Sequence, residues 1–163
     1  MTNHIVTKPV ITLSGITTRT TNAEEMGPNG RLPQLWETFH QSNIAAQVEV
    51  VDSHLIYALY TDYESDANGA YTVLVGHEID NNTVQADSHL SQAVIPESTF
   101  MVFTSKKGPV FKVVAEAWGE IWEYFSHSPE EHRSYTGDFE LYDTRGLDPD
   151  NVEVKIYIAI KST

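Results

Sequence analysis

The sequence contains no cysteine, so it has neither a disulfide framework nor a cysteine-based zinc site. Long apolar runs are also missing: no window approaches the roughly 18 apolar residues that a membrane-spanning helix needs. The first six residues lack the basic segment and apolar run of a secretory signal. We therefore expect a soluble cytoplasmic protein that does not bind membranes.

Basic residues are scarce. Ten Lys and Arg stand against 23 Asp and Glu, which gives a formal net charge of −13. This charge repels nucleic acid and attracts cations, so direct binding to nucleic acid is not expected.

Motifs of catalysis and cofactor binding are absent as well. The sequence has no P-loop, no G-x-G-x-x-G, no G-x-S-x-G and no H-E-x-x-H. Its seven histidines are scattered without the spacing of metal ligands. Neither a metal site nor a cofactor is expected.

The apolar pattern predicts one α+β domain that spans residues 1–163, although two small subdomains are also compatible with the length. Strands are predicted at residues 9–20, 54–63, 70–79, 99–104, 138–142 and 152–161. Helices are predicted at residues 33–40 and 109–127, and residues 1–8 are expected to form a polar lead-in.

The order strand, helix, strand, strand occurs twice, which indicates a duplication. The segment 35–39 (LWETF) resembles the segment 121–125 (IWEYF). We expect two β-α-β-β units, at about residues 9–80 and 94–161, related by a pseudo-two-fold axis. Their strands would form a curved antiparallel sheet with both helices on one face and a ligand groove on the other.

A carboxylate lies beside aromatic residues in the predicted strand 138–142. Alternation places Phe139 and Leu141 on one face, and Glu140 and Tyr142 on the other. In the next strand the Val and Ile residues alternate toward the expected helix side, so Tyr157 is predicted to share the groove face with Glu140. Tyr57 or Tyr60 would contribute from the first half.

A carboxylate surrounded by Tyr and Trp side chains suits a lipophilic cation, because the rings attract the cation and the acid supplies the countercharge. Burial would raise the pKa of Glu140, so cation affinity should fall as the pH drops through that pKa. Two simpler interpretations stay open. Glu140 could face water, as most strand Glu residues do. Trp118, Trp122 and Phe125 could be core residues of an amphipathic helix, and helix aromatics can also form a groove wall.

Five segments, 94–103, 107–109, 118–125, 138–143 and 154–160, resemble in order and spacing the GyrI-like effector-binding domain. This family supplies the multidrug-sensing modules of AraC-type and MerR-type regulators and also occurs as stand-alone proteins. Among the stand-alone members, the chain is similar to the integron-associated effector-binding proteins, which bind cationic drugs.

The resemblance implies that Glu140 is the carboxylate that meets the ligand's positive charge. It implies aromatic walls from Tyr57, Tyr60, Trp118, Tyr142 and Tyr157, to which we add Trp122 from the predicted helix.

The leading hypothesis is a stand-alone binding protein for lipophilic aromatic cations, linked to drug sensing or transcription regulation. Only about eight residues precede the first predicted strand, so no helix-turn-helix is expected there. Any action on DNA would need a DNA-binding partner, and a homodimer is also possible.

Two other functions stay open. One is a GyrI-like small-molecule hydrolase in which Glu140 and a Tyr act as general acid and base. The other is an interaction protein that inhibits a topoisomerase, although the acidic residues do not form the stripe that DNA mimicry would favour.

Overall fold

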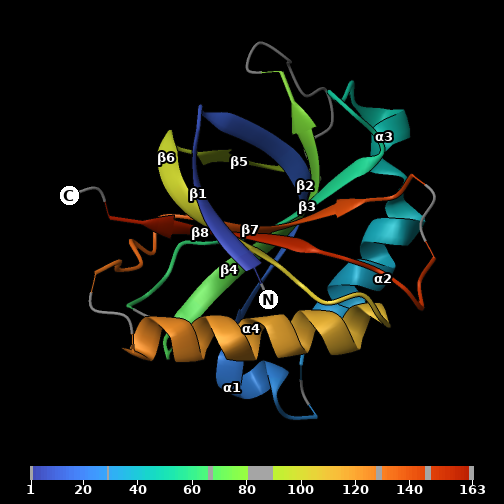
Figure 1. The fold of residues 1–163 in the computed structure, drawn as a ribbon. Helices are drawn as coiled ribbons and strands as arrows, with labels where there is room; N and C mark the ends of the chain where they lie inside the picture. The colour runs from blue at the N-terminus through green and yellow to red at the C-terminus, as the bar shows by residue number, and fades with distance from the viewer. Residues whose placement is uncertain are drawn as a thin grey trace.

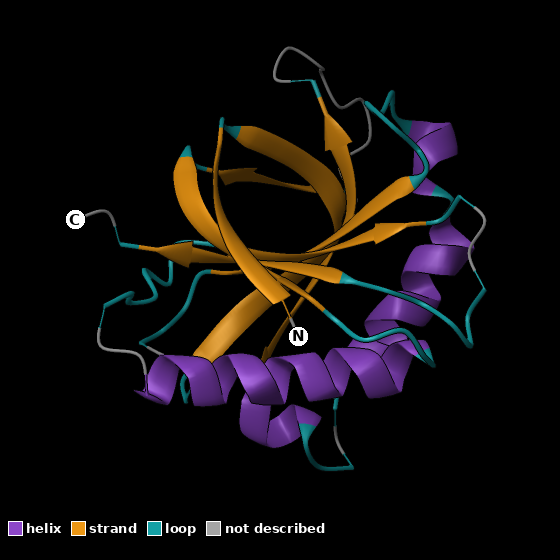
Figure 2. Cartoon of the chain, viewed as in Figure 1, coloured by secondary structure: helices purple, strands orange, loops and turns teal. Residues whose placement is uncertain are grey.

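A computed structural model describes residues 2–28, 30–65, 68–80, 90–127, 130–145 and 148–161 of the chain. Figures 1 and 2 show a strongly curved sheet with helices on its outer side. The strands are β1 (Thr2–Lys8), β2 (Ile11–Thr21), β3 (Leu55–Thr61), β4 (Ala70–Ile79), β5 (Ser91–Ile95), β6 (Ser98–Thr104), β7 (Asp138–Asp143) and β8 (Lys155–Ile160). The helices are α1 (Asn22–Glu25), α2 (Leu32–Ser42), α3 (Ile44–Gln47) and α4 (Val110–His127).

The eight strands form one antiparallel sheet in the order β1-β6-β8-β7-β3-β4-β2-β5. This order reads the same way from both ends: β7 corresponds to β3, β8 to β4, β6 to β2, and β1 to β5. The predicted α+β fold of two β-α-β-β units with pseudo-two-fold symmetry is therefore confirmed. Each half also begins with an extra strand that pairs with the other half, because β1 joins β6 and β5 joins β2.

Strand β1 corrects the expectation of a polar lead-in at residues 1–8. Residues 2–8 contain only two large apolar residues, Ile5 and Val6, and Ile5 is 54% exposed. Val6 packs against the inner core, and pairing with β6 along the whole strand supplies the backbone hydrogen bonds. Edge pairing with a distant strand therefore overrides a weak local pattern. Residues 81–89, between β4 and β5, lie outside the described residues.

The two faces of the curved sheet carry different cores. The inner face holds a cluster that includes Leu59, Phe100, Phe139 and Tyr157. On the outer face, α4 packs over β6 and β8, and α2 packs over β2, β3 and β4. Each helix buries one apolar stripe: Leu35 and Phe39 on α2, and Val113, Ala117, Trp118 and Ile121 on α4. In the described part of the chain, no helix is both long and apolar enough to cross a membrane.

The groove lies on the helix side of the sheet, not on the opposite side as expected. Directly opposite residues of antiparallel strands share a face. Glu140 is paired with Ile156, which packs beneath α4, whereas Phe139 is paired with Tyr157 of the inner core. The two helices leave a gap between them above Ile56 and Tyr60 of β3 and Glu140 and Tyr142 of β7.

Candidate ligand-binding site

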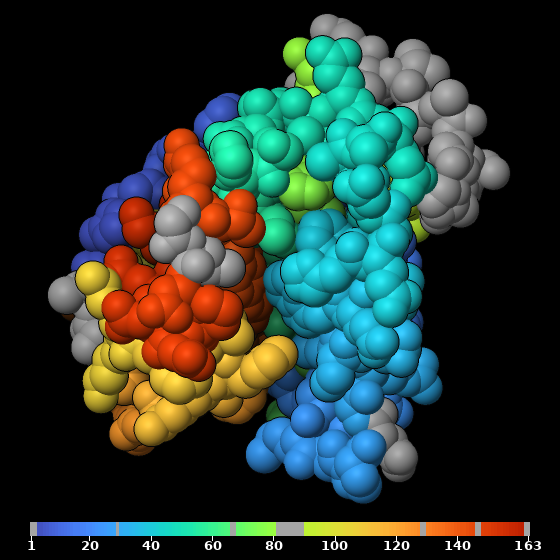
Figure 3. All heavy atoms as spheres, turned by 90° about the vertical axis from the view of Figure 1, so that its right-hand side faces the viewer, coloured from blue at the N-terminus to red at the C-terminus, as the bar shows by residue number. Residues whose placement is uncertain are grey.

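A cavity of about 900 Å³ lies between α2 and α4, above the two central strands β3 and β7. Figure 3 shows the hollow between the blue-to-cyan segment that contains α1 and α2 and the yellow-to-red part of the chain, which includes α4. Its volume is toward the upper end of the range found for pockets that hold drug-sized molecules.

Each helix lines the cavity with a second stripe beside its buried one. On α4, Phe111, Val114, Trp118 and Trp122 follow one another at helical spacing. Across the cavity, Trp36 of α2 packs edge-on against Tyr142, with ring centroids 5.1 Å apart. Both long walls of the cavity therefore carry aromatic side chains.

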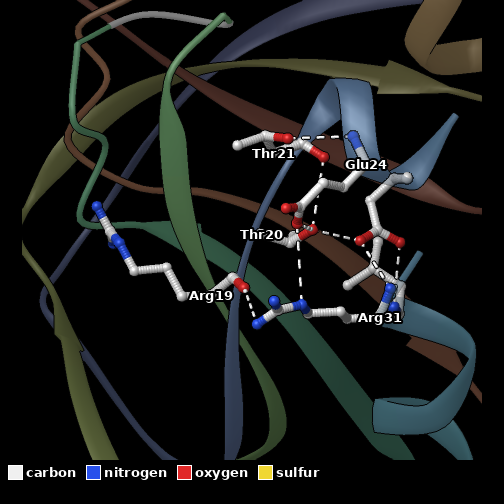
Figure 4. A network of polar contacts seen from close by, with 7 residues as sticks. Arg19, Thr20, Thr21, Glu24 and Arg31 are labelled. Carbon is white, nitrogen blue, oxygen red and sulfur yellow. Dashed lines mark hydrogen bonds and ion pairs between the residues drawn. The ribbon is translucent and has the colours of Figure 1, made fainter. Parts of the chain in front are cut away.

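A polar network holds the wall formed by α1 and the start of α2. Glu25 accepts hydrogen bonds from the backbone N–H groups of Arg31 (2.9 Å) and Leu32 (3.1 Å) and from the hydroxyl of Thr20. Figure 4 shows this region, in which Thr21 also caps α1 by accepting the N–H of Glu24 at 3.1 Å. These contacts compensate free donors at the starts of two helices and fix the wall to β2.

Glu140 lies at the floor of the cavity and is 2% exposed. Its partner across the ladder to β3 is Ala58, whose small side chain leaves room for the carboxylate. Oε2 accepts hydrogen bonds from the Tyr60 hydroxyl (2.8 Å) and from the Trp118 indole N–H (2.6 Å). Oε1 accepts one from the Tyr142 hydroxyl at 2.5 Å.

All three donors to Glu140 are uncharged. No Lys, Arg or His among the described residues lies within ion-pair distance of its carboxylate. Burial raises the pKa of Glu140 above its ordinary value, and the three hydrogen bonds only partly oppose this effect. Burial, followed by the charge of Glu140, raises the pKa of Tyr60 and Tyr142 well above their ordinary values, so both hydroxyls remain protonated donors.

A second buried carboxylate, Asp138, lies two residues before Glu140 on the same face of β7. Its Oδ2 accepts hydrogen bonds from Nη2 of Arg133 (2.7 Å) and from the Tyr63 hydroxyl (2.5 Å), and its Oδ1 accepts the backbone N–H of Ala159 (2.8 Å). Burial alone would lower the pKa of Arg133, but the charge of Asp138 raises it above its ordinary value. Arg133 also lies over the ring of Tyr135, with its guanidinium carbon 4.4 Å from the centroid.

The structure brings five of the seven predicted site residues to this cavity: Glu140, Tyr60, Trp118, Trp122 and Tyr142. The alternative in which Glu140 faces water is contradicted by its burial. Trp118 packs in the core cluster beneath α4 and also lines the cavity, so the core and wall interpretations both apply to it.

Tyr57 and Tyr157 do not share the face of Glu140, and this part of the prediction is wrong. Both lie in the inner core. The hydroxyl of Tyr57 donates to Glu78 at 3.2 Å, and the ring of Tyr157 stacks on Phe139 with centroids 4.5 Å apart. The error follows from placing the groove on the sheet face away from the helices. The Val and Ile residues of β8 do face α4 and Tyr157 does face away from it, as predicted, but Glu140 is paired with Ile156 and lies on the helix side.

Several cavity residues were missed from the sequence, among them Trp36, Tyr71 and Arg133. Trp36 could have been found, because it occupies the same position in the repeat as Trp122. Arg133 lies in an irregular segment whose sequence carries no periodic signal. Among the described residues, no group of three or more His, Asp or Glu side chains is arranged to hold a metal ion.

Comparisons with known proteins agree with this architecture. Residues 4–160 match the family model of the integron-associated effector binding protein. YobU of Bacillus subtilis (strain 168), a candidate transcriptional regulator, is 34% identical over 160 residues, which cover 98% of each chain. The crystal structure of an integron cassette protein from the mobile metagenome of Vibrio cholerae has a TM-score of 0.78 and 31% identity, over 98% of this chain and 95% of that one.

The protein SAV2435, in a structure with bound tetraphenylphosphonium, has a TM-score of 0.78 and 20% identity, over 99% of this chain and 95% of that one. At this identity the likeness shows the fold. The family match and the relatives at more than 30% identity cover nearly the whole chain. The chain therefore belongs to the family of integron-associated effector binding proteins.

Proposed function

We propose that this protein binds amphipathic aromatic cations in the cavity between α2 and α4, with the carboxylate of Glu140 as the countercharge. The observation that carries the proposal is that Glu140 is buried in an aromatic cavity and that, among the described residues, its hydrogen-bond donors are all uncharged. A buried carboxylate without a cation is unfavourable. A ligand that brings a positive charge would relieve this cost.

The rings around Glu140 support a cation and not merely a hydrogen-bond donor. Tyr60, Trp118 and Tyr142 surround the carboxylate and line the cavity. An aromatic face contributes about 0.5–2 kcal/mol to binding a cation, with the larger values at desolvated sites. SAV2435, which shares the fold, is a protein whose structure contains a lipophilic cation of this kind.

We infer that ligand binding serves drug sensing or sequestration linked to transcription regulation. The support is the likeness to YobU, a candidate transcriptional regulator. A DNA-binding partner or a homodimer would transmit the signal, since the net charge of −13 disfavours direct contact with DNA.

Two ions of the same shape and opposite charge test the proposal. Tetraphenylphosphonium is expected to bind and to raise the melting temperature, whereas tetraphenylborate is not. Glu140→Gln should weaken tetraphenylphosphonium binding at least about tenfold, which corresponds to 1.4 kcal/mol. Calorimetric titration measures the affinity, and circular dichroism checks that the variant is folded.

The matched control is Glu123→Gln, which removes an exposed carboxylate from α4. It should change the affinity by less than about twofold, because exposed charges are well screened. Equal losses in the two variants, or equal binding of the two ions, would contradict the proposal.

A small-molecule hydrolase is the second candidate. It is favoured by the Tyr60 and Tyr142 hydroxyls at 2.8 and 2.5 Å from a carboxylate with a raised pKa, which is a suitable arrangement for general acid–base catalysis. Turnover of electrophilic aromatic compounds by the unmodified protein, but not by Glu140→Gln, would favour this function over simple binding.

A further inference from the structure

Arg133 lines the same cavity as Glu140 although it is only 7% exposed. Its contact with Asp138 uses a single nitrogen, Nη2, at 2.7 Å. A guanidinium and a carboxylate can form two parallel hydrogen bonds, but here Oδ1 of Asp138 already accepts the backbone N–H of Ala159. The ion pair therefore leaves two guanidinium nitrogens, Nε and Nη1, without an acceptor among the described residues.

These two nitrogens, Nε and Nη1, differ in how deeply they are buried. Nε is fully buried and has no hydrogen-bond acceptor among the described residues. Nη1 makes no hydrogen bond with the described residues either, but it is not among the fully buried atoms that lack a partner. Because the residue lines the cavity and is otherwise buried, we infer that Nη1 presents its N–H groups there. An acceptor on a ligand in the cavity would therefore gain a hydrogen bond from Nη1 without breaking the contact between Nη2 and Asp138.

We propose that Arg133 forms a second polar subsite of the cavity, which binds a neutral hydrogen-bond acceptor of the ligand, such as a carbonyl oxygen. This inference rests on the proposed cation-binding function and narrows its ligand class to aromatic cations that carry an acceptor at the far end.

The acceptor should be neutral because the surroundings are already negative. Asp138 balances the charge of Arg133, and Glu25, Glu37 and Glu140 also line the cavity. A ligand carboxylate would have to compete with Asp138 and would be repelled by the other acids. A carbonyl oxygen accepts the same hydrogen bond without this penalty.

The spacing of the two subsites sets the spacing of the two ligand groups. Asp138 and Glu140 are two residues apart on one strand face, which separates their backbones by about 7 Å. Trp118 connects the subsites: its N–H donates to Glu140 at 2.6 Å, and its ring centroid lies 6.0 Å from the guanidinium carbon of Arg133. The cation and the acceptor should therefore lie about one aromatic ring apart, against the same indole.

Three substituted phosphonium ions test the proposal: (4-acetylphenyl)-, (4-ethylphenyl)- and (4-carboxyphenyl)triphenylphosphonium. Each places its substituent one benzene ring away from the positive phosphorus. In the unmodified protein the acetyl compound should bind about tenfold more tightly than the ethyl compound, and the carboxylate compound should bind more weakly than the acetyl one.

The ratio of the acetyl and ethyl dissociation constants is the readout, since a general change in the cavity affects both compounds alike. In Arg133→Met the ratio should fall to about one. The double variant Arg133→Met/Asp138→Asn repeats the measurement without an unpaired buried carboxylate, in case the single variant does not fold. Arg133→Lys keeps the charge and should retain only part of the preference.

The outcomes separate this inference from the proposed function. If both compounds bind through Glu140 with equal affinity to the unmodified protein, the Arg133 subsite is wrong and the proposed function stands. A preference that persists in the double variant also overturns the subsite. If neither compound binds, the proposed function fails and the inference fails with it.

Discussion

Asp138 and Glu140 lie on the same face of one strand, but their carboxylates have different kinds of partner. Asp138 is fully buried and has a cationic partner, Arg133, which is itself surrounded by aromatic rings. Glu140 is almost equally buried and has aromatic rings around it, but its partners are two hydroxyls and an indole N–H. The two sites share Trp118, which lies between them.

This difference distinguishes a structural site at Asp138 from a candidate binding site at Glu140. The Asp138 site contains its own cation and connects the segment before β7 to the backbone of β8, as expected of a structural ion pair. The Glu140 site has the same chemistry without the cation, and it opens to a cavity of about 900 Å³. The Asp138–Arg133 pair thus provides, within the same protein, an example of the cation–carboxylate arrangement that we propose for a ligand at Glu140.

The largest expected effect comes from breaking the structural pair. Arg133→Met leaves the carboxylate of Asp138 buried, and its remaining partners among the described residues are the Tyr63 hydroxyl and the Ala159 N–H. Removing one member of a buried ion pair typically lowers the free energy of unfolding by about 3–5 kcal/mol. Urea unfolding followed by circular dichroism measures this loss.

The double variant Arg133→Met/Asp138→Asn is the control, since it removes both charges. It should recover most of the lost stability, because replacing a buried ion pair with neutral groups is often nearly neutral. A single variant as stable as the unmodified protein would show that Asp138 does not depend on Arg133, and the comparison with Glu140 would lose its basis.

A smaller change in the free energy of unfolding, of opposite sign, is expected for Glu140→Gln. The folded protein holds the Glu140 proton more tightly than the unfolded chain does, because burial raises the pKa of this carboxyl in the folded state. Ionisation of Glu140 therefore lowers the free energy of unfolding as the pH rises from the ordinary carboxyl pKa to the raised one. Glu140→Gln removes this contribution, so its stability relative to the unmodified protein should rise across that pH range.

The same titration controls ligand binding. Tetraphenylphosphonium favours ionised Glu140, so its affinity should fall as the pH drops through the raised pKa and should vary much less in Glu140→Gln. Unfolding and binding measured at several pH values in both proteins check these expectations. A stability difference between the two proteins that is independent of pH would contradict the raised pKa.

The sequence predicts the repeating elements well because their apolar periodicity is strong. The stripe of Val113, Ala117 and Ile121 identifies α4, and the alternation around Ile156 and Ile158 identifies β8. Strand β1 escapes prediction because its polar sequence gains its structure from pairing with β6, which is distant in the chain.

The site is predicted only in part, for two physical reasons. Alternation places Glu140 and Tyr142 on one face, but it cannot say which face of the sheet the helices cover, and so Glu140 and Tyr142 were expected on the face of Tyr157, away from the helices. Arg133 comes from an irregular segment, and only the folded chain brings it to Asp138. The position of Trp36 could have been read from the internal repeat, because it corresponds to Trp122.

The smallest expected effect tests which face of the sheet binds the ligand. Tyr157→Phe removes a hydroxyl from the inner core and keeps the ring that stacks on Phe139. Because Tyr157 lies across the sheet from the cavity, calorimetric titration should show less than about a twofold change in tetraphenylphosphonium affinity, which is below 0.5 kcal/mol. Tyr142→Phe is the matched change on the cavity side, since it removes a hydrogen bond to Glu140 and should weaken binding by more. A larger loss of affinity in Tyr157→Phe than in Tyr142→Phe would move the ligand to the inner face, away from the helices, where the groove is expected from the sequence alone.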